Sequence, residues 1–186
     1  LLALEAQAYF ARNEPGLATN TLEAAVEQSP KDENRFVTVT RVYFQNGQFS
    51  NALATVNRHL KIAPDNPALL VNKGLISMQA NAYNEAIEPL TRALTLQDTN
   101  HLARFYRAIS YLRTDQMDAA QEDYETLQPT FPSAYPIYYG LGEISYRRKD
   151  TNAAIRYYEA YLTNSVPIEE GKFVRLRLKE LKGEKP

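Results

Sequence analysis

The stretch Pro67–Asn100, PALLVNKGLISMQANAYNEAIEPLTRALTLQDTN, contains two runs of apolar residues at helical spacing, with a polar break between them. In the first run, Leu70, Gly74 and Met78 recur every fourth residue. The second run predicts a helix over Tyr83–Leu96, because its apolar residues recur at i, i+3, i+4 and i+7 and share one helix face. The stretch therefore predicts two antiparallel helices joined by a short turn.

The same pattern returns along the chain every 34 residues, an interval that we call the repeat length. Five evenly spaced alanines mark it: Ala18, Ala52, Ala86, Ala120 and Ala154. A second column holds a small residue in each first helix: Ala6, Thr40, Gly74, Ala108 and Gly142. Small residues let two helix axes approach closely, and the bulky residues four positions after each alanine are expected to fill the space between them. A period of this length is typical of a solenoid of stacked helix pairs.

The register divides the chain into five units and a C-terminal segment. The units are 1–32, 33–66, 67–100, 101–134 and 135–168, and turn-forming residues separate the two helices of each. Residues 169–186 depart from the pattern and are expected to form a capping helix and tail. Its apolar residues, expected to face the fifth unit, are Phe173, Val174, Leu178 and Leu181. A solenoid needs an end of this kind, with its outer side polar.

These features resemble the tetratricopeptide repeat (TPR) family, whose unit is two helices in about 34 residues. In the second unit, the matching residues are Phe36, Thr40, Tyr43, Ala52 and Pro64. The resemblance covers residues 1–168 and implies an all-α fold, a right-handed α-solenoid of antiparallel helix pairs. Three columns depart from the family pattern and are expected to pack loosely: those of His59, Arg104 and Asp98.

Composition excludes several classes of function. The chain of 186 residues has no cysteine, which excludes disulfides, thiolate metal sites and cysteine nucleophiles. Its 21 lysines and arginines stand against 22 acidic residues, so the basic excess of a nucleic-acid-binding protein is absent. No apolar run approaches the roughly 18 residues that span a bilayer. We therefore expect neither a nucleic-acid partner nor membrane insertion.

The chain begins Leu1-Leu2-Ala3-Leu4, already within the repeat and without methionine. We interpret this as a fragment or a processed chain from which any targeting signal is missing, so the sequence leaves the compartment open. The three leucines also predict that earlier units or a partner cover this end.

Residues for catalysis or metal binding are scarce. The two histidines, His59 and His101, have no partner nearby in the sequence and lack metal-ligand spacing. His59 is predicted to pack between units, and His101 to lie at the surface. The Gly-x-Gly of Gly140 and Gly142 follows no strand and is better explained by helix packing. We therefore expect no catalytic site, no metal and no cofactor.

Partner binding is expected on the concave face that the first helices line, because family resemblance implies an extended peptide or a partner helix there. The candidate residues by register are Arg41, Phe44, Val71, Asn72, Leu75, Met78, Phe105, Tyr106, Ile109, Leu112, Arg113, Tyr139, Glu143, Tyr146 and Arg147. This predicted groove is apolar and aromatic with interspersed arginines, which suits an apolar or aromatic segment. Packing between adjacent first helices is the alternative role, notably for Tyr139 and Tyr146.

One TPR binding mode clamps a C-terminal carboxylate with lysine, asparagine and arginine from three consecutive first helices. Asn72 matches the asparagine, but Val37, Leu102 and Tyr106 occupy the lysine and arginine positions. The sequence therefore argues against binding of chaperone tails.

The leading hypothesis is a non-catalytic scaffold that holds a protein or peptide segment in the groove. One alternative is a self-assembling structural protein, a homo-oligomer formed through the groove or the apolar N-terminal end. The other is the TPR segment of a larger enzyme or of an envelope or secretion assembly.

Overall fold

The computed structural model describes residues 2–29, 31–164 and 166–184, so Leu1 of the apolar N-terminal end lies outside the described residues. Helices and turns make up this part of the chain, and no strand occurs in it. The helices are α1 (Leu2–Ala11), α2 (Pro15–Gln28), α3 (Glu33–Gln45), α4 (Phe49–Leu60), α5 (Pro67–Gln79), α6 (Tyr83–Leu96), α7 (His101–Arg113), α8 (Met117–Leu127), α9 (Tyr135–Arg147), α10 (Thr151–Thr163) and α11 (Ile168–Lys182). The all-α helix-pair fold expected from the repeat is confirmed.

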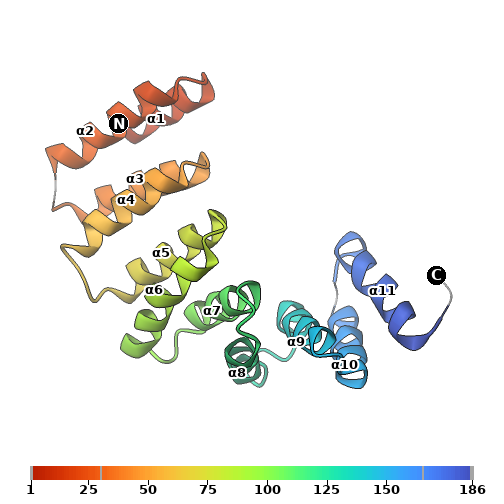
Figure 1. Ribbon diagram of the computed structural model, residues 1–186. Coiled ribbons are helices and arrows are strands. Elements are labelled where there is room, and N and C mark those ends of the chain that lie inside the picture. The colour runs from red at the N-terminus through yellow and green to blue at the C-terminus, as the bar shows by residue number, and fades with distance from the viewer. Residues whose placement is uncertain (1, 30, 165, 185–186) are drawn as a thin grey trace. The chain divides into compact units, whose positions relative to one another are not determined.

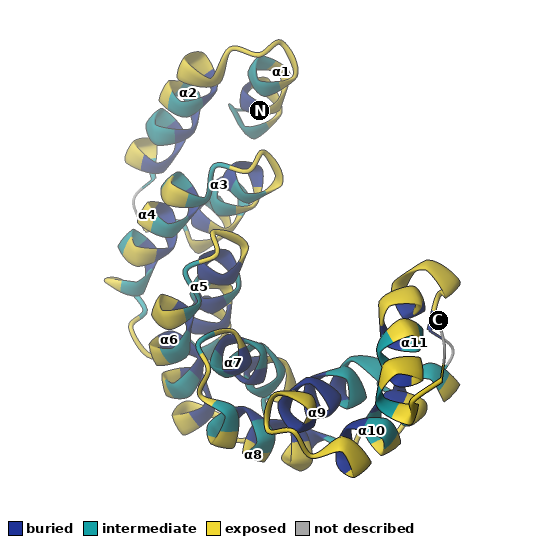
Figure 2. Ribbon diagram, turned by 45° about the vertical axis from the view of Figure 1, so that its right-hand side comes forward, coloured by how far each residue is buried: buried dark blue, intermediate teal, exposed yellow. Residues whose placement is uncertain are grey.

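The chain divides into two compact units, residues 1–103 and 104–186, and the division falls inside α7. In the first unit, α1 and α2, α3 and α4, and α5 and α6 form antiparallel hairpins that stack in chain order (Figure 1). In the second unit, α9 pairs with α10, and α11 packs on α10. The helix sides that face these neighbours are buried, whereas the outward sides are exposed (Figure 2).

The helix pair predicted from Pro67–Asn100 has the expected bounds. The Asn66 side chain caps α5 by accepting hydrogen bonds from the backbone N–H of Ala68, at 3.0 Å, and of Leu69, at 3.2 Å. Pro67 occupies the first turn, where its missing N–H is no loss. The second helix runs over Tyr83–Leu96 as predicted, and it continues through the buried Pro89.

Each turn inside a hairpin is built in the same way. One residue adopts a left-handed backbone with φ between 60° and 69°, namely Asn13, Gly47, Asn81, Asp115 or Lys149. The next residue donates its backbone N–H to a carbonyl five positions earlier, as at Gln48 and Tyr43, where N and O are 2.9 Å apart. This bond satisfies a carbonyl that the helix end leaves without an intrahelical donor. The turn residues therefore recur once in every repeat, like the core.

The alanine column marks the closest helix contacts. Ala18, Ala52, Ala86, Ala120 and Ala154 all have no exposed surface. In the third and fifth helix pairs, the small residue of the first helix packs against the bulky residue that follows the alanine by four positions on the second helix. A Cβ atom on Gly74 would lie 2.5 Å from Cγ of Leu90, and one on Gly142 would lie 2.6 Å from the Tyr158 ring. Glycine is therefore required at these two positions by the close approach of the neighbouring helix.

Polar groups reinforce the stacking of the first two hairpins. The buried Tyr43 of α3 donates its hydroxyl to Glu23 of α2, at 3.3 Å from Oε1. Arg58 of α4 pairs with the other oxygen of Glu23 at 2.6 Å. Burial, together with the charge of Glu23, raises the pKa of Tyr43 to about 12. One carboxylate thus links helices from both hairpins.

The C-terminal helix α11 packs on the fifth helix pair through one side. Val174 and Leu178 are buried and Leu181 is half-buried in a cluster with Tyr158 and Tyr161. The prediction for Phe173 is wrong: it is 53% exposed and contacts the guanidinium of Arg177 instead of the apolar cluster. Phe173 lies about 100° around the helix from Val174, and its ring packs against Arg177 of the same helix.

Substitution of Gly74 by alanine is expected to lower the free energy of unfolding by about 1–3 kcal/mol, because the added Cβ overlaps the fully buried Leu90. Gly74→Leu and Ala86→Leu are expected to cost at least as much. Gly16→Ala in α2 is the matched control: a Cβ there meets nothing within 4 Å, so its helix propensity should leave stability unchanged or slightly raised. Urea denaturation measures the unfolding free energy of Gly74→Ala and of Gly16→Ala. Equal changes in the two variants would contradict the close contact between Gly74 and Leu90.

Candidate functional site

A hollow opens between the first helices α3 and α5 in the first unit, and its volume is about 260 Å³. Its lining residues are Val37, Thr40, Arg41, Phe44, Val56, His59, Leu69, Asn72, Leu75 and Ile76. Arg41, Phe44, Asn72 and Leu75 come from the residues that the sequence assigned to the groove. The structure therefore brings the second-unit and third-unit candidates together around one depression.

Helical spacing explains how α3 contributes its wall. Val37, Arg41 and Phe44 are separated by four and three residues and therefore lie on one face of the helix. Val37 is 50% exposed, and Phe44 is half-buried with its ring edge-on to that of Phe49, at 5.7 Å between centroids. An exposed apolar side chain beside a fixed aromatic ring offers a partner a surface that is already ordered.

The rim of the hollow is polar. Arg41 and Asn72 are exposed, and neither makes a hydrogen bond or an ion pair with the described residues. Arg41 is the one charged residue among those described in the lining, because burial keeps His59 neutral near pH 7. The hollow thus combines apolar walls with one cation and one amide whose hydrogen-bonding groups remain available.

His59 forms the buried floor next to the hollow. Its ring stacks on Phe36, with centroids 4.9 Å apart and planes 17° from parallel, and 3% of the residue is exposed. Its Nε2 atom has no hydrogen-bond partner among the described residues. Burial lowers the pKa of His59, against the opposing effect of the negative charge of Glu33. His59 is buried, as a packing role requires, but its stack on Phe36 lies within the second unit, between α3 and α4, and the column is filled by stacking and not loosely.

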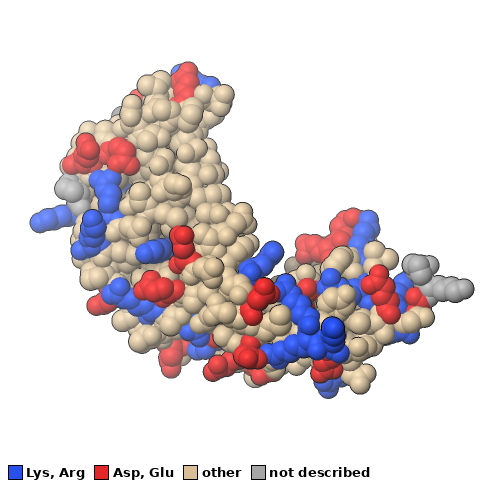
Figure 3. Space-filling view, viewed as in Figure 1, with Lys and Arg blue, Asp and Glu red and all other residues tan. Residues whose placement is uncertain are grey.

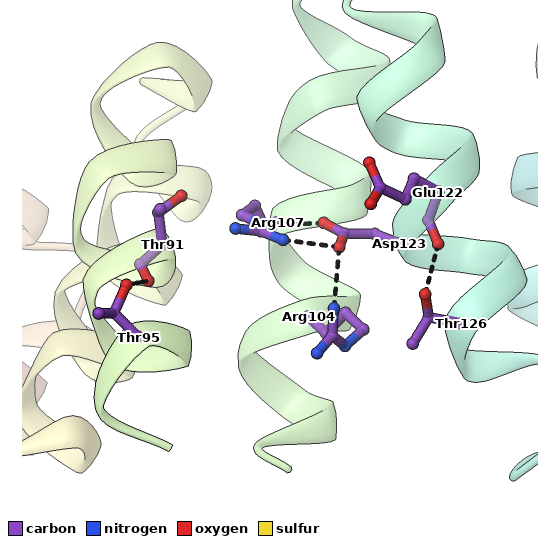
Figure 4. A network of polar contacts seen from close by, with 7 residues as sticks. All are labelled: Thr91, Thr95, Arg104, Arg107, Glu122, Asp123 and Thr126. Atoms are coloured by element: carbon purple, nitrogen blue, oxygen red, sulfur yellow. Dashed lines mark hydrogen bonds and ion pairs between the residues drawn. The ribbon is translucent and has the colours of Figure 1, made fainter. Parts of the chain in front are cut away.

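In the second unit, a buried carboxylate joins α7 and α8. Asp123 is 2% exposed and accepts two hydrogen bonds from Arg107, both at 2.8 Å, and a longer one from Arg104 at 3.4 Å. Figure 4 shows both arginines reaching from α7 toward Asp123 on α8. The column of Arg104, expected to pack loosely, is therefore held by a charge-assisted contact.

The aromatic candidates of α7 are only partly available. Phe105, Tyr106 and Ile109 are half-buried, and the Phe105 ring lies edge-on to the buried Tyr124, with centroids 6.3 Å apart. Arg113 is exposed. Phe105 therefore serves the core of the second unit as well as its surface.

Glu143 and Tyr146 of α9 are engaged by the C-terminal helix. Glu143 is 9% exposed, pairs with Arg177 of α11 and accepts the hydroxyl of Tyr158 at 2.6 Å. The Arg177 guanidinium lies 4.1 Å from the centre of the Tyr146 ring and 4.2 Å from that of Phe173. These candidates thus hold α11 against α9, and Glu143 in particular is removed from the surface.

Tyr139 also has a packing partner. It is half-buried, its ring lies 5.6 Å from that of Tyr161, and burial raises the pKa of its hydroxyl. Arg147 donates to the backbone oxygen of Leu112 at 3.1 Å and pairs with Asp115 at 2.8 Å. Tyr161 belongs to the second helix of the same pair, so this contact packs Tyr139 inside its own unit, whereas Arg147 links the first helices α9 and α7.

Burial removes three more candidates from a binding surface. Val71, Met78 and Leu112 are 6%, 9% and 7% exposed. Each lies on the same helix as an exposed or half-buried candidate and within a few residues of it. The sequence pattern did not separate the buried side of these helices from the accessible side. The candidates that remain accessible in the first unit are those of the hollow.

The surface charges of the first unit are unevenly distributed. Charged side chains gather along its left-hand side in Figure 3, whereas its right-hand side is almost uncharged in that view.

No group of three or more histidine, aspartate or glutamate residues suited to a metal ion occurs within residues 2–29, 31–164 and 166–184. None of the described helices combines the length and apolarity that a membrane span requires.

Removal of the unpaired imidazole is expected to change how stability depends on pH. The unfolded chain protonates His59 near pH 6.5, whereas the folded chain does so only at lower pH. The free energy of unfolding should therefore fall as the pH drops below about 6.5, because the unfolded state binds the proton more tightly. In His59→Leu, denaturation between pH 5 and 8 should show a smaller decrease.

Loss of one partner from the Glu143–Arg177 pair should loosen α11. Glu143→Gln leaves the nearly buried Arg177 guanidinium without its counter-charge, which is expected to cost about 2 kcal/mol or more of unfolding free energy. Glu143→Met combined with Arg177→Met should recover part of that loss, because no charge then remains to be solvated. A double-mutant cycle in urea measures the coupling, and additive effects would show that the pair contributes nothing specific.

The comparisons with known proteins agree in one family. Two models of the tetratricopeptide repeat match residues 39–109 and 105–165. Anaphase-promoting complex subunit 3 of Schizosaccharomyces pombe is 23% identical over 155 residues, which cover 83% of this chain and 23% of that protein. The chain spans less than a quarter of the length of the curated relatives that it matches.

Solved structures show the same fold at low identity. YrrB, a TPR protein with an unusual peptide-binding site, superposes with a TM-score of 0.74 at 16% identity, covering 96% of this chain and 90% of YrrB. PilW, a type IV pilus biogenesis factor, gives 0.75 at 18% identity, covering 98% of this chain and 84% of PilW. Together with the matching repeat models and the helix pairs, these findings establish that the chain belongs to the tetratricopeptide repeat family, whose helix-pair scaffolds bind other proteins.

Proposed function

We propose that the chain is a non-catalytic interaction module that holds an apolar or aromatic segment of a partner protein in the hollow between α3 and α5. The hollow itself carries this proposal: it is large enough for a bulky side chain, its walls are mostly apolar, and Arg41 and Asn72 at its rim have no partner among residues 2–29, 31–164 and 166–184. Pockets with apolar walls and a few placed polar groups are typical of recognition sites. The peptide-binding site named for YrrB, a protein of the same fold, adds support by analogy.

The arrangement favours an extended segment with one anchoring side chain. Val37 and Leu75 face the anchor from opposite helices, and Phe44 supplies a ring fixed against Phe49. Burial of a Leu-sized or Phe-sized side chain there contributes about 1.5–3 kcal/mol. Hydrogen bonds from Arg41 and Asn72 then fix the direction of the segment, because misplaced polar groups would lose their bonds with water.

Peptide selection on the immobilised chain tests the proposal. Random 12-residue peptides displayed on phage are selected, and the enriched peptide is measured by calorimetry. We expect Val37→Asp and Arg41→Glu each to raise its Kd at least about tenfold, a loss of about 1.4 kcal/mol. Leu17→Asp is the matched control, because Leu17 on α2 is likewise 50% exposed but does not line the hollow. Unchanged affinity in both hollow variants, or no enriched peptide, would refute the site.

A second candidate is work within a larger assembly, to which several repeat surfaces contribute. The fission-yeast relative is a subunit of the anaphase-promoting complex, and PilW is a pilus biogenesis factor. Self-assembly would use exposed apolar residues such as Leu4, which is 69% exposed. Light scattering over a range of concentrations tests self-assembly, because a chain that stays monomeric at every concentration does not form a homo-oligomer.

A further inference from the structure

The hollow between α3 and α5 has one polar side chain at its floor. Of the lining residues that the structure describes, Val56, Leu69, Ile76 and His59 are buried, each at most 5% exposed. The first three are apolar, so His59 supplies the polar side chain at this depth. The remaining polar residues of the lining are more exposed. A side chain that fills the hollow therefore meets apolar walls along its length and an imidazole at its inner end.

The imidazole of His59 is held in place but lacks a hydrogen bond. Its ring stacks on that of Phe36, with 4.9 Å between the centroids, and its Nε2 atom has no partner among the described residues. Burial lowers the pKa of His59, so the ring is neutral near pH 7. In a neutral imidazole, Nε2 donates a hydrogen bond in one tautomer and accepts one in the other. A ligand group that both donates and accepts satisfies Nε2 in either tautomer.

Tyrosine is the side chain that combines the two properties that the hollow requires. Its ring buries apolar surface against the walls, and its hydroxyl both donates and accepts hydrogen bonds. Phenylalanine and leucine fill the same space but leave Nε2 of His59 covered and unbonded, which is unfavourable. The indole N–H of tryptophan only donates, so it serves one tautomer alone. Serine and threonine carry a hydroxyl without the apolar body that the walls at Val37 and Leu75 would cover.

We propose that the hollow selects a tyrosine side chain of the partner segment, whose hydroxyl forms a hydrogen bond with the imidazole of His59. This inference rests on the proposed function, because it names the anchor that the hollow takes. The tyrosine ring lies between Val37 and Leu75, and its hydroxyl reaches the floor. A site that hydrogen-bonds a hydroxyl discriminates strongly against the analogue that lacks it, so tyrosine is preferred to phenylalanine although phenylalanine is the more apolar.

The test uses two phage libraries of random 12-residue peptides that differ only in their central residue, which is tyrosine or phenylalanine. Both are selected on the immobilised full chain, and the enriched peptides are synthesised with either central residue and measured by calorimetry. Replacement of the central tyrosine by phenylalanine should raise the Kd at least about tenfold, or 1.4 kcal/mol. On the variant His59→Phe, which keeps an aromatic ring against Phe36, the same replacement should change the Kd less than about twofold.

Two controls identify the group that binds the hydroxyl. Thr40→Val removes the half-buried hydroxyl of the lining and should leave the preference for tyrosine intact. Arg41→Ala, at the rim, should weaken the tyrosine and phenylalanine peptides by the same factor. A preference that persists in His59→Phe, or disappears in Thr40→Val, would overturn the proposal.

Nuclear magnetic resonance provides a measurement that needs no variant. The imidazole ¹⁵N signals of His59 should shift when the tyrosine peptide binds and shift much less with the phenylalanine peptide, because only the first forms the hydrogen bond. Equal shifts with both peptides would overturn the proposal. Circular dichroism verifies that His59→Phe is folded.

Failure of the tyrosine preference and failure of the hollow give different results. If tyrosine and phenylalanine peptides bind equally and Val37→Asp weakens both, the hollow is a binding site and the preference is refuted. If Val37→Asp weakens neither, or if neither library yields a peptide, the hollow and the preference are both refuted. A fully random library that enriches tryptophan or leucine as the anchor would also refute the preference.

Discussion

The structure depends on one steric constraint, the contact between a small residue on each first helix and a bulky residue on the second. At Gly74 this contact leaves no room for a Cβ atom, because Leu90 fills the space. Close approach maximises the number of dispersion contacts between helices, and those contacts are lost steeply as a gap opens. A constant repeat length preserves the contact from one pair to the next. The alanines recur at the repeat length because each marks the same close contact in successive helix pairs.

This constraint also determines which residues are free to bind. A side chain in a packing column is fixed by its neighbours, and only those between columns can vary with the partner. Val37, Arg41 and Asn72 lie between columns and are exposed, which is why the hollow in the first unit combines apolar and polar chemistry. Tyr146 also lies between columns, yet its ring is in contact with the guanidinium of Arg177 on α11. A position outside the core columns is therefore necessary for a binding role but does not establish it.

The sequence predicted the fold well because the fold is periodic. The bounds of α6, the turn at Asn81 and the burial of the alanines all follow from local spacing. The candidate site was less predictable, since the contacts of Glu143 depend on a helix whose pattern differs from the repeat. The sequence did contain a signal for the contact of Glu143 with Arg177. Arg177 follows Glu143 by one repeat length, as Gly183 follows Lys149, so the two residues occupy equivalent positions on neighbouring helices. The unpaired Nε2 of His59 left no trace in the sequence, because it arises from the absence of a polar neighbour in three dimensions.

The buried His59 of the first unit differs from the buried carboxylates of the second unit in how its polar groups are satisfied. In the second unit, Asp123 receives two arginines and Glu143 receives an arginine and a tyrosine, so each buried charge has its counter-charge. In the first unit, Nε2 of the buried His59, beside the hollow, has no partner in the part of the chain that the structure describes. An unsatisfied buried nitrogen costs about 1–3 kcal/mol. Stacking of the imidazole on Phe36 and burial of the surrounding apolar side chains act against this cost.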